Sequence, residues 1–163
     1  MARGLIRYCP VCDVYEIRGK RIAVVGSGAH GFDEACFIRD YSASVTLIPS
    51  DGSQAFAEDG IGVLDSPMSG LALSGEEISV IQENGETRRF DTLYAALGTS
   101  ARTSLAATLG VRLAEGGCIV VDERQRTSID RVYAIGDVTD GLDQIAVAMG
   151  QGAVAATAIH NDA

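Results

Sequence analysis

The sequence has little positive charge and lacks long apolar runs. It carries 13 lysines and arginines against 22 aspartates and glutamates, so its formal net charge is −9. A surplus of negative charge repels phosphate backbones, which argues against nucleic acid as a partner. Every apolar run falls short of the roughly 20 residues that a membrane-spanning helix needs. We therefore expect neither nucleic acid nor a membrane as a partner.

The start of the sequence and its composition exclude two further classes. Residues 1–5 are too short for the apolar core of a signal peptide, so we expect a cytoplasmic location. Disorder is not expected, because 47% of the residues are hydrophobic and 19 are glycine. A chain of 163 residues with this composition fits one compact α/β domain, or one domain plus an appendage.

Cysteine is also scarce, and its four positions exclude the dense disulfide framework of small secreted proteins. Cys36 and Cys118 stand alone among apolar neighbours, so we expect packed thiols. Cys9 and Cys12 form a Cys-x-x-Cys pair, which can close a redox disulfide or supply two zinc ligands. The remaining thiols and histidines are not at ligand spacing, so the redox interpretation is favoured and no metal site is predicted. Zinc shared across a dimer and an inert pair remain alternatives.

A strand, a glycine-rich turn, a helix and a second strand follow the cysteine pair. Residues 21–25 form a short apolar run typical of a buried parallel strand, and residues 45–48 form another. Helical spacing of apolar residues between them predicts a βαβ unit. In this context Gly-x-Gly-x-x-Gly indicates a dinucleotide site, because the turn lets a pyrophosphate approach the amides of the helix N-terminus. A turn that holds nothing is the alternative. The candidate binding residues are Gly26, Ser27, Gly28, Ala29, His30 and Gly31.

The residues after the second strand bear on the choice of nucleotide. An acidic side chain there usually binds a ribose 2′-hydroxyl, whereas an arginine usually binds a 2′-phosphate. Residues 48–53 contain Asp51 and no basic residue. We therefore expect NAD(P)H as the coenzyme, with NADH favoured over NADPH. Loss of nucleotide binding is the alternative.

Further strands are predicted in the middle of the chain. Residues 62–65 read as a third strand, and residues 92–97 as a buried strand that ends at Gly98. Residues 78–82 and 87–90 flank Asn-Gly, which favours the positive φ angles of a tight β-hairpin. Residues 53–57 show a weak helical pattern.

The last third of the chain changes character. Residues 118–121 and 132–135 are predicted strands, and the second ends at Gly136 and Asp137. A carboxylate in that position can accept hydrogen bonds from a polyol, although capping of the next loop is an alternative. A helix with one apolar face is predicted from Gln144 onward. We place the seam near residues 115–117, which gives two segments, residues 1–116 and 117–163.

The chain carries, in this order, the Cys-x-x-Cys pair, the glycine-rich βαβ unit and the strand that ends at Gly136 and Asp137. This arrangement resembles the thioredoxin reductase family of class II pyridine nucleotide-disulfide oxidoreductases. The likeness runs from about Tyr8 to Asn161. It implies an α/β fold, with a Rossmann-like three-layer nucleotide-binding domain that includes a β-meander, plus a C-terminal strand–helix remnant of an FAD domain. It also implies a flavin-dependent disulfide oxidoreductase. Electrons would pass from NAD(P)H through FAD to the Cys9–Cys12 disulfide, and then to a thioredoxin-like protein or a small disulfide.

The resemblance assigns roles to individual residues. By it, Cys9 attacks the substrate disulfide, Cys12 faces the flavin and Asp13 is the acid. Asp137 contacts the ribityl chain, with Gln144 and Ile145 near the isoalloxazine. The predicted cofactor-binding residues outside the glycine turn are thus Asp51, Gly98, Gly136, Asp137, Gln144, Ile145 and Ala146.

The sequence departs from the family in ways that affect function. The N-terminal FAD-binding half is missing, Ser50 and Asp51 replace the family's paired arginines, the helix of residues 52–60 is short, and Val14 replaces a glycine. Tight FAD binding is therefore expected of a full-length relative and not of this chain. The bare C-terminal segment is expected to fold back on the nucleotide domain or to pair in a homodimer. The alternatives are a non-catalytic nucleotide-binding fragment, or one half of a split reductase whose FAD domain is a separate chain.

Overall fold

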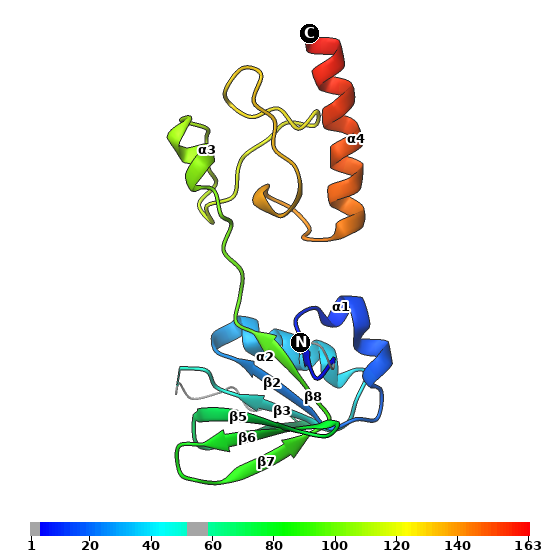
Figure 1. Ribbon diagram of the computed structural model, residues 1–163, viewed down its shortest axis with the longest axis vertical. Coiled ribbons are helices and arrows are strands. Elements are labelled where there is room, and N and C mark those ends of the chain that lie inside the picture. The colour runs from blue at the N-terminus through cyan, green and yellow to red at the C-terminus, as the bar shows by residue number, and fades with distance from the viewer. Residues whose placement is uncertain (1–3, 52–58) are drawn as a thin grey trace. The chain divides into compact units, whose positions relative to one another are not determined.

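The structure is a computed structural model that describes residues 4–51 and 59–163. The chain forms two compact units, Met1–Gly98 and Thr99–Ala163, and each is described by itself (Figure 1). The division into nucleotide-binding and FAD segments at residues 116 and 117 stays a prediction. The weak helix expected over residues 53–57 lies outside the described residues.

A five-stranded parallel sheet forms the centre of the first unit. Its strand order is β1-β8-β2-β3-β4, and every neighbouring pair is parallel. All five residues of β2 are buried, as expected for a strand covered on both faces. The predicted strands at residues 21–25, 45–48, 62–65 and 92–97 are confirmed within one or two residues. The strands are β1 (Ile6–Arg7), β2 (Ile22–Gly26), β3 (Val45–Ile48), β4 (Ile61–Val63) and β8 (Thr92–Ala96).

A three-stranded antiparallel sheet covers one face of the parallel sheet. It consists of β5 (Met68–Ser74), β6 (Glu77–Gln82) and β7 (Thr87–Phe90). The predicted hairpin is confirmed, since β6 pairs with β7 around a turn in which Gly85 has a φ of +87°. β5 was not predicted, because its run of small and apolar residues lacks a clear alternation.

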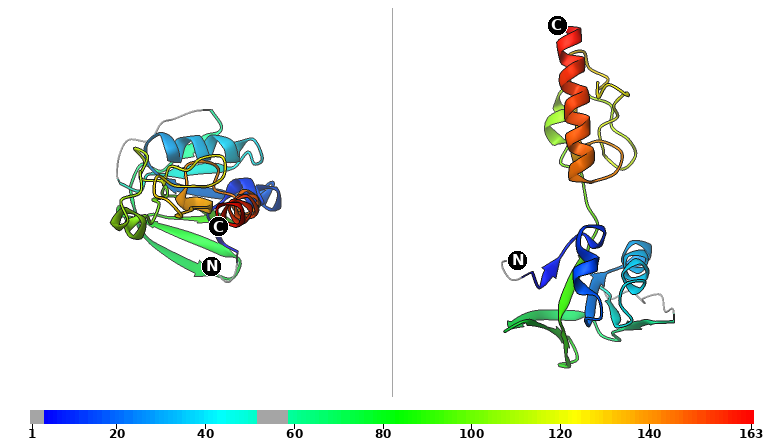
Figure 2. Two further views of the ribbon diagram at one scale, coloured as in Figure 1. Left: turned by 90° about the horizontal axis from the view of Figure 1, so that it is seen from above. Right: turned by 90° about the vertical axis from the view of Figure 1, so that its right-hand side faces the viewer.

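Helices cover the opposite face. The helical segments are α1 (Pro10–Asp13), the 3₁₀ helix η1 (Val14–Ile17) and α2 (Gly28–Arg39). Their buried side chains form one apolar cluster with the helix-facing residues of the parallel sheet, and the hairpin side has a second cluster. The views in Figure 2 show α2 and the antiparallel sheet on opposite sides of the parallel sheet. The predicted three-layer α/β fold with a β-meander is therefore confirmed.

The second unit contains little regular structure apart from its last helix. Its helical segments are α3 (Ser104–Thr108), η2 (Gly136–Val138) and α4 (Ile145–Asp162). The strands predicted at residues 118–121 and 132–135 are wrong as regular strands, because the chain there makes only isolated bridges such as Ile119 with Thr139. Each apolar run has the side chains of a strand, but no continuous partner pairs with it. The buried core is small, with Val111, Ile119 and Ala134.

Helix α4 confirms the helix predicted from Gln144, which is its N-cap. Its C-terminal end is tied down at Asp162, whose carboxylate accepts two hydrogen bonds from Arg126 and one from the hydroxyl of Tyr133. Only Ala155 and Ala158 are buried along the helix. Among residues 4–51 and 59–163, no helix combines the length and apolar character needed to cross a membrane.

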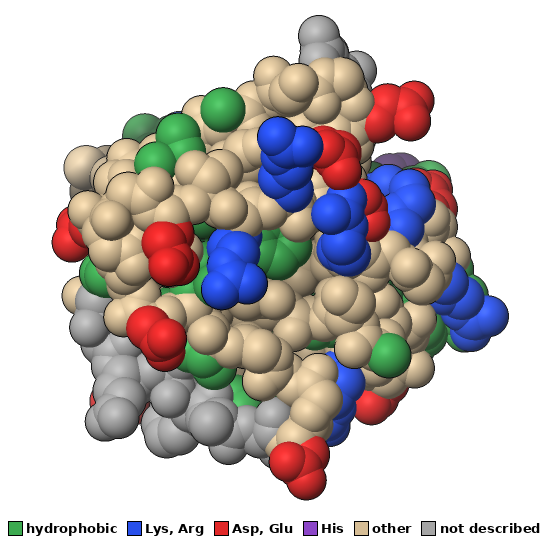
Figure 3. All heavy atoms as spheres, turned by 90° about the horizontal axis from the view of Figure 1, so that it is seen from below, with side chains coloured by type: hydrophobic (Ala, Val, Ile, Leu, Met, Phe, Trp, Pro, Cys, Tyr) green, Lys and Arg blue, Asp and Glu red, His purple; other side chains and the backbone are tan. Residues whose placement is uncertain are grey.

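The face seen in Figure 3 carries basic and acidic side chains close together. The guanidinium of Arg21 forms ion pairs with the carboxylates of Glu77 and Asp91, at N–O distances of 2.6 and 2.5 Å. Arg21 donates to both oxygens of Asp91, which lowers the pKa of that carboxyl through these hydrogen bonds. The pairs join the residue before β2 to β6 and to the residue between β7 and β8.

Candidate functional site

Cys9 and Cys12 form a disulfide at the start of α1, with their Cα atoms 5.3 Å apart. Cys9 is the N-cap of the helix, and the amide of Cys12 donates to the carbonyl of Cys9 at 3.0 Å. Pro10 occupies the first helical turn, where its fixed φ suits a helix and its missing N–H costs nothing. The predicted pairing is thus confirmed, and the exposed position of Cys12 leaves the disulfide open to solvent. Cys36 and Cys118 take no part in a disulfide and are half-buried.

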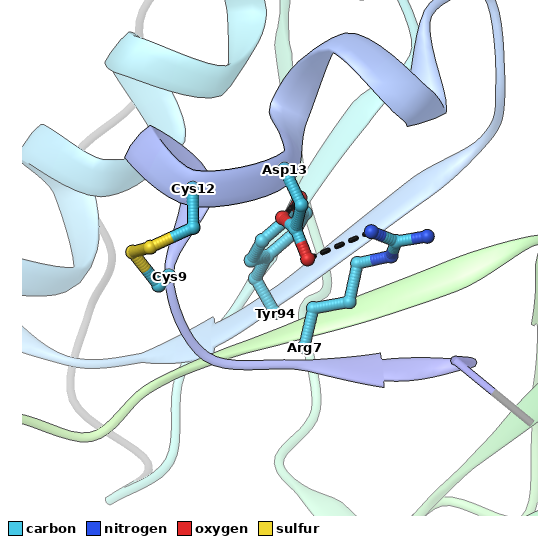
Figure 4. Close-up of a disulfide and its surroundings, with 5 residues drawn as sticks. All are labelled: Arg7, Cys9, Cys12, Asp13 and Tyr94. Atoms are coloured by element: carbon cyan, nitrogen blue, oxygen red, sulfur yellow. Dashed lines mark hydrogen bonds and ion pairs between the residues drawn. A yellow bond between two sulfur atoms is a disulfide. The ribbon is translucent and has the colours of Figure 1, made fainter. Parts of the chain in front are cut away.

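Asp13, the residue after the pair, contacts the sheet beneath it. One carboxylate oxygen lies 2.7 Å from the guanidinium of Arg7 on β1, and the other accepts a 2.5 Å hydrogen bond from the hydroxyl of Tyr94 on β8. Arg7 also contacts Glu16 of η1 at 2.9 Å. Figure 4 shows the carboxylate of Asp13 turned toward Arg7 and Tyr94 and away from the disulfide. Nothing in the sequence pattern indicated this cluster, because Tyr94 lies 81 residues from Asp13.

Burial and hydrogen bonds set the charges in this cluster. Burial raises the pKa of Tyr94 well above its ordinary value, and the hydrogen bond to Asp13 raises it further. Burial alone would lower the pKa of Arg7, but hydrogen bonds to Glu16 and Asp13 outweigh it and the pKa is raised. Tyr94 is therefore a neutral donor and Arg7 a cation across the physiological pH range.

The glycine-rich turn lies between β2 and α2, as predicted. A Cβ on Gly26 would come within 2.5 Å of the carbonyl oxygen of Ala96, and one on Gly31 within 2.7 Å of the carbonyl carbon of Gly26. These two glycines therefore let the helix and strand pack closely. Gly28 differs, since its φ is +62° and no heavy atom lies within 4 Å of a Cβ placed there. The open space beside Gly28 suits a pyrophosphate approaching the first amides of α2.

Asp51 lies at the same edge of the sheet as the glycine turn. The hydroxyl of Ser27 donates to the carboxylate of Asp51 at 2.6 Å and accepts from the amide of Ser50 at 3.0 Å. This contact places an acidic side chain beside the turn, where a ribose hydroxyl could meet it. The carboxyl ends of parallel strands in open α/β sheets are the usual place for a ligand.

Two further polar residues lie on the first turns of α2. His30 is exposed, and its Nε2 lies 3.8 Å from Glu34 one turn later. Burial raises the pKa of Glu34, against a smaller lowering by His30. Glu34 was missed by the sequence reasoning, although its spacing of four residues from His30 on a predicted helix was a usable signal. Ala29, between Gly28 and His30, is also exposed.

Of the remaining candidates, Gly98 lies at this same carboxyl edge, two residues after Ala96, which pairs with Gly26, and the others lie in the second unit. Gly98 follows β8 with a φ of +76° and is exposed. In the second unit, Gly136 and Asp137 form η2, whereas Gln144, Ile145 and Ala146 form the start of α4. η2 contacts α4 through Gln151, a residue missed from sequence, whose side-chain oxygen accepts a hydrogen bond from the amide of Gly136 at 2.7 Å. Asp137 and Ile145 are exposed.

The two units differ in how well they fit a nucleotide. The first has an open glycine at the N-terminus of α2 and an acidic side chain beside it at one edge of the sheet, which fit NAD(P)H. In the second, η2 packs against α4, and Asp137, Gln144 and Ile145 are the residues that would hold part of an FAD. Across the part of the chain that the structure describes, no group of three metal-ligating side chains could hold a metal ion.

Comparison with known proteins agrees with this geometry. The chain is 32% identical to dihydrolipoyl dehydrogenase of Corynebacterium glutamicum over 86% of its length, which is 34% of that protein. The thioredoxin reductase structures of Streptococcus pyogenes and Giardia duodenalis superpose with TM-scores of 0.84 and 0.77, at 27% and 29% identity. The chain covers 57% and 58% of those two proteins, and they cover 99% and 98% of it. It thus spans only about a third to three fifths of these relatives.

The sequence profile of one family extends over almost the whole chain. It matches residues 2–152 and describes pyridine nucleotide-disulphide oxidoreductases. Those residues include the Cys9–Cys12 disulfide, the glycine turn and the start of α4. The chain belongs to the pyridine nucleotide-disulphide oxidoreductase family.

Proposed function

We propose that this chain is the nucleotide-binding and disulfide-bearing part of a flavin-dependent disulfide reductase that resembles thioredoxin reductase. The observation that carries the proposal is the solvent-open Cys9–Cys12 disulfide, which directly precedes the β2–turn–α2 unit in the same compact body. Electrons from NAD(P)H reduce the Cys9–Cys12 disulfide, and the resulting thiols reduce a substrate disulfide. The substrate class is a thioredoxin-like protein or a small disulfide.

The chemistry of the cysteine pair is a two-electron exchange. The Cys9–Cys12 bond accepts two electrons and two protons and becomes two thiols. The Cys9 thiolate then attacks a substrate disulfide, forms a mixed disulfide and releases the first substrate thiol. Cys12 attacks the Cys9 sulfur, which restores the disulfide and releases the second substrate thiol. Cys9 is half-buried and Cys12 exposed, so the disulfide as a whole is in contact with solvent.

The flavin requirement follows from the family and from chemistry. When bound, FAD accepts a hydride from the nicotinamide and passes its electron pair to a disulfide. Asp137, Gln144 and Ile145 are the residues of this chain that would hold the ribityl and ring end. Because the chain covers only 57% of the Streptococcus pyogenes structure, we expect the chain alone to retain FAD weakly.

NADH is the expected coenzyme. Asp51 accepts a hydrogen bond from Ser27 beside the turn and carries the negative charge that a 2′-phosphate would meet. A phosphate in that position would be repelled, whereas a ribose hydroxyl could donate to the carboxylate. The preference rests on this one side chain.

Thiol counting under anaerobic conditions tests the proposal. The full chain is mixed with NADH, FAD and a purified FAD domain of a thioredoxin reductase relative, and thiols are counted by alkylation and mass. We expect two new thiols per chain and none in the Cys9→Ser/Cys12→Ser variant. Absorbance near 450 nm reports whether flavin stays with the chain alone. No new thiols, with the FAD domain present and its flavin reduced, would contradict the proposal.

A split reductase is the second candidate, favoured by the bare face of α4. Ile145 and Met149 are 81% and 72% exposed, which is unusual for large apolar side chains repeated along one helix. A separate FAD-binding chain or a second copy of this chain would cover them. Co-purification of a stoichiometric FAD-binding chain supports the split form, whereas a homodimer without flavin supports a non-catalytic nucleotide-binding module.

A further inference from the structure

A partly buried polar cluster lies between the redox helix and the parallel sheet. Its centre is Asp13, at the end of α1, which contacts Arg7 of β1 at 2.7 Å and Tyr94 of β8 at 2.5 Å. The side chains of Arg7 and Asp13 are 13% and 28% exposed, and Tyr94 is fully buried. β1 and β8 are neighbouring parallel strands, and the register pairs Arg7 with Tyr94. Both partners of Asp13 therefore lie side by side on the sheet.

The short helices that carry the disulfide depend on contacts such as these. α1 and η1 have four residues each, and helices of that length are unstable without tertiary contacts. Neither helix has a side-chain hydrogen bond at its N-cap. Val14 and Ile17 pack into the apolar cluster, and Asp13 supplies the polar attachment one residue after Cys12. Asp13 therefore makes a polar contact with the sheet directly after Cys12 in the chain.

The orientation of Asp13 differs from that of a proton donor to the cysteine pair. Its two oxygens are engaged by Tyr94 and Arg7, and Figure 4 shows them pointing away from the disulfide. A buried tyrosine hydroxyl needs an acceptor, and Asp13 is the one it has among the described residues. Loss of the carboxylate would leave this hydroxyl and the Arg7 guanidinium without their shared partner.

We propose that Asp13 anchors the redox helix to the sheet, and that Arg7 and Tyr94 are positioning residues that hold it there. The anchor keeps the backbone of Cys12 where its sulfur reaches that of Cys9, which raises the effective concentration of one thiol near the other. A high effective concentration favours the disulfide over the dithiol. The role of the anchor in electron transfer rests on the proposed reductase function, whereas its effect on the Cys9–Cys12 disulfide can be measured on this chain alone.

The test is the reduction equilibrium of the full chain with dithiothreitol, without nucleotide or flavin. In this reaction the Cys9–Cys12 bond breaks, dithiothreitol closes to its cyclic disulfide, and its two hydrogens end on the two cysteine sulfurs. The disulfide fraction is read by alkylation and mass at several ratios of reduced to oxidised dithiothreitol. Because the readout involves no NADH, it is unaffected if the proposed electron transfer fails.

Tyr94→Phe is the decisive variant, since it removes one hydroxyl and keeps the buried ring. We expect its equilibrium to shift about tenfold toward the dithiol, which corresponds to about 1.4 kcal/mol. Asp13→Asn should shift it in the same direction. Tyr133→Phe is the matched control, because it also removes a tyrosine hydroxyl that donates to a carboxylate, that of Asp162, in the other unit. We expect no shift for this control.

Three results would overturn the proposal. The first is a natively folded Tyr94→Phe variant with the wild-type equilibrium, and the second is an equal shift in Tyr133→Phe. The third is a slower exchange in Asp13→Asn with an unchanged equilibrium, which would assign proton donation to Asp13 instead. If Asp13→Asn does not fold, Tyr94→Phe alone decides between an anchor and no anchor.

Discussion

The two units of this chain bury their apolar side chains to different extents. In the first, a parallel sheet is covered on both faces, and each face has its own apolar cluster. In the second, an 18-residue helix buries only Ala155 and Ala158, while Ile145 and Met149 stay exposed. The first unit buries apolar side chains on both faces of its sheet, whereas the second leaves large apolar side chains of α4 exposed. The two units therefore differ in how much of their stability comes from a packed core.

Glycine gives the largest expected contrast between the units. Gly26→Ala would place a Cβ 2.5 Å from the carbonyl oxygen of Ala96 and 3.0 Å from the Cα of Gly31, and both contacts are backbone. We expect it to lower the free energy of unfolding of the first unit by about 3 kcal/mol. Gly150→Ala in α4 meets no atom within 4 Å, so it should stabilise the second unit by about 0.5–1 kcal/mol.

Hydrogen exchange resolved by unit measures both variants. Protection should fall across β2 and β8 in Gly26→Ala and rise along α4 in Gly150→Ala. Equal losses in the two variants would mean that α4 is as tightly covered as β2, and the contrast between the units would be wrong.

Helix α4 offers a second contrast within one element. Ala155→Gln would force a longer polar side chain into a site that is 6% exposed, so we expect it to cost about 2 kcal/mol. Met149→Gln, at a position that is 72% exposed, should change stability by no more than about 0.5 kcal/mol. Chemical denaturation followed at α4 amides distinguishes them. A loss above about 1 kcal/mol for Met149→Gln would show that the exposed face is covered, as it would be in a homodimer.

A fall in pH should fray the C-terminal turn of α4, and this is the smallest of the expected effects. Hydrogen bonds from Arg126 and then Tyr133 lower the pKa of Asp162 to about 2. A carboxyl with a lowered pKa contributes its stability above its unfolded value of about 4, and the contribution is lost as the pH falls toward 2. NMR of α4 amides between pH 5 and 2 should show fraying at the C-terminal turn. Asp162→Asn should be frayed already at pH 5, and an identical pH profile in that variant would contradict the assignment.

Short-range pattern accounts for most of what could be predicted from the sequence. The β2–turn–α2–β3 unit and the Asn84-Gly85 hairpin follow from apolar runs and glycine positions that lie within a few residues of each other. The strands expected at residues 118–121 and 132–135 failed because a β-branched run becomes a strand only when another strand pairs with it. The cluster of Arg7, Asp13 and Tyr94 could not be predicted, since parallel pairing of β1 with β8 joins residues far apart in sequence.

The site predictions divide in the same way. The Cys9–Cys12 pair was predicted from its spacing, and the glycine turn from its spacing together with the strand and helix that flank it. The contact of Ser27 with Asp51 depends on two strand ends meeting at one edge of the sheet, which only the fold supplies. The orientation of Asp13 away from the disulfide also required coordinates, because sequence gives the neighbour of Cys12 and not the direction of its side chain.

Titration of the full chain with NADH by calorimetry tests most directly whether the first unit is functionally complete. We expect one site per chain, weaker binding of NADPH, and loss of binding in Gly28→Val, which fills the open space beside the turn and disfavours its positive φ. Cys9→Ser/Cys12→Ser should bind NADH as the wild type does. Absence of NADH binding to the folded wild-type chain, or equal binding to Gly28→Val, would contradict the account.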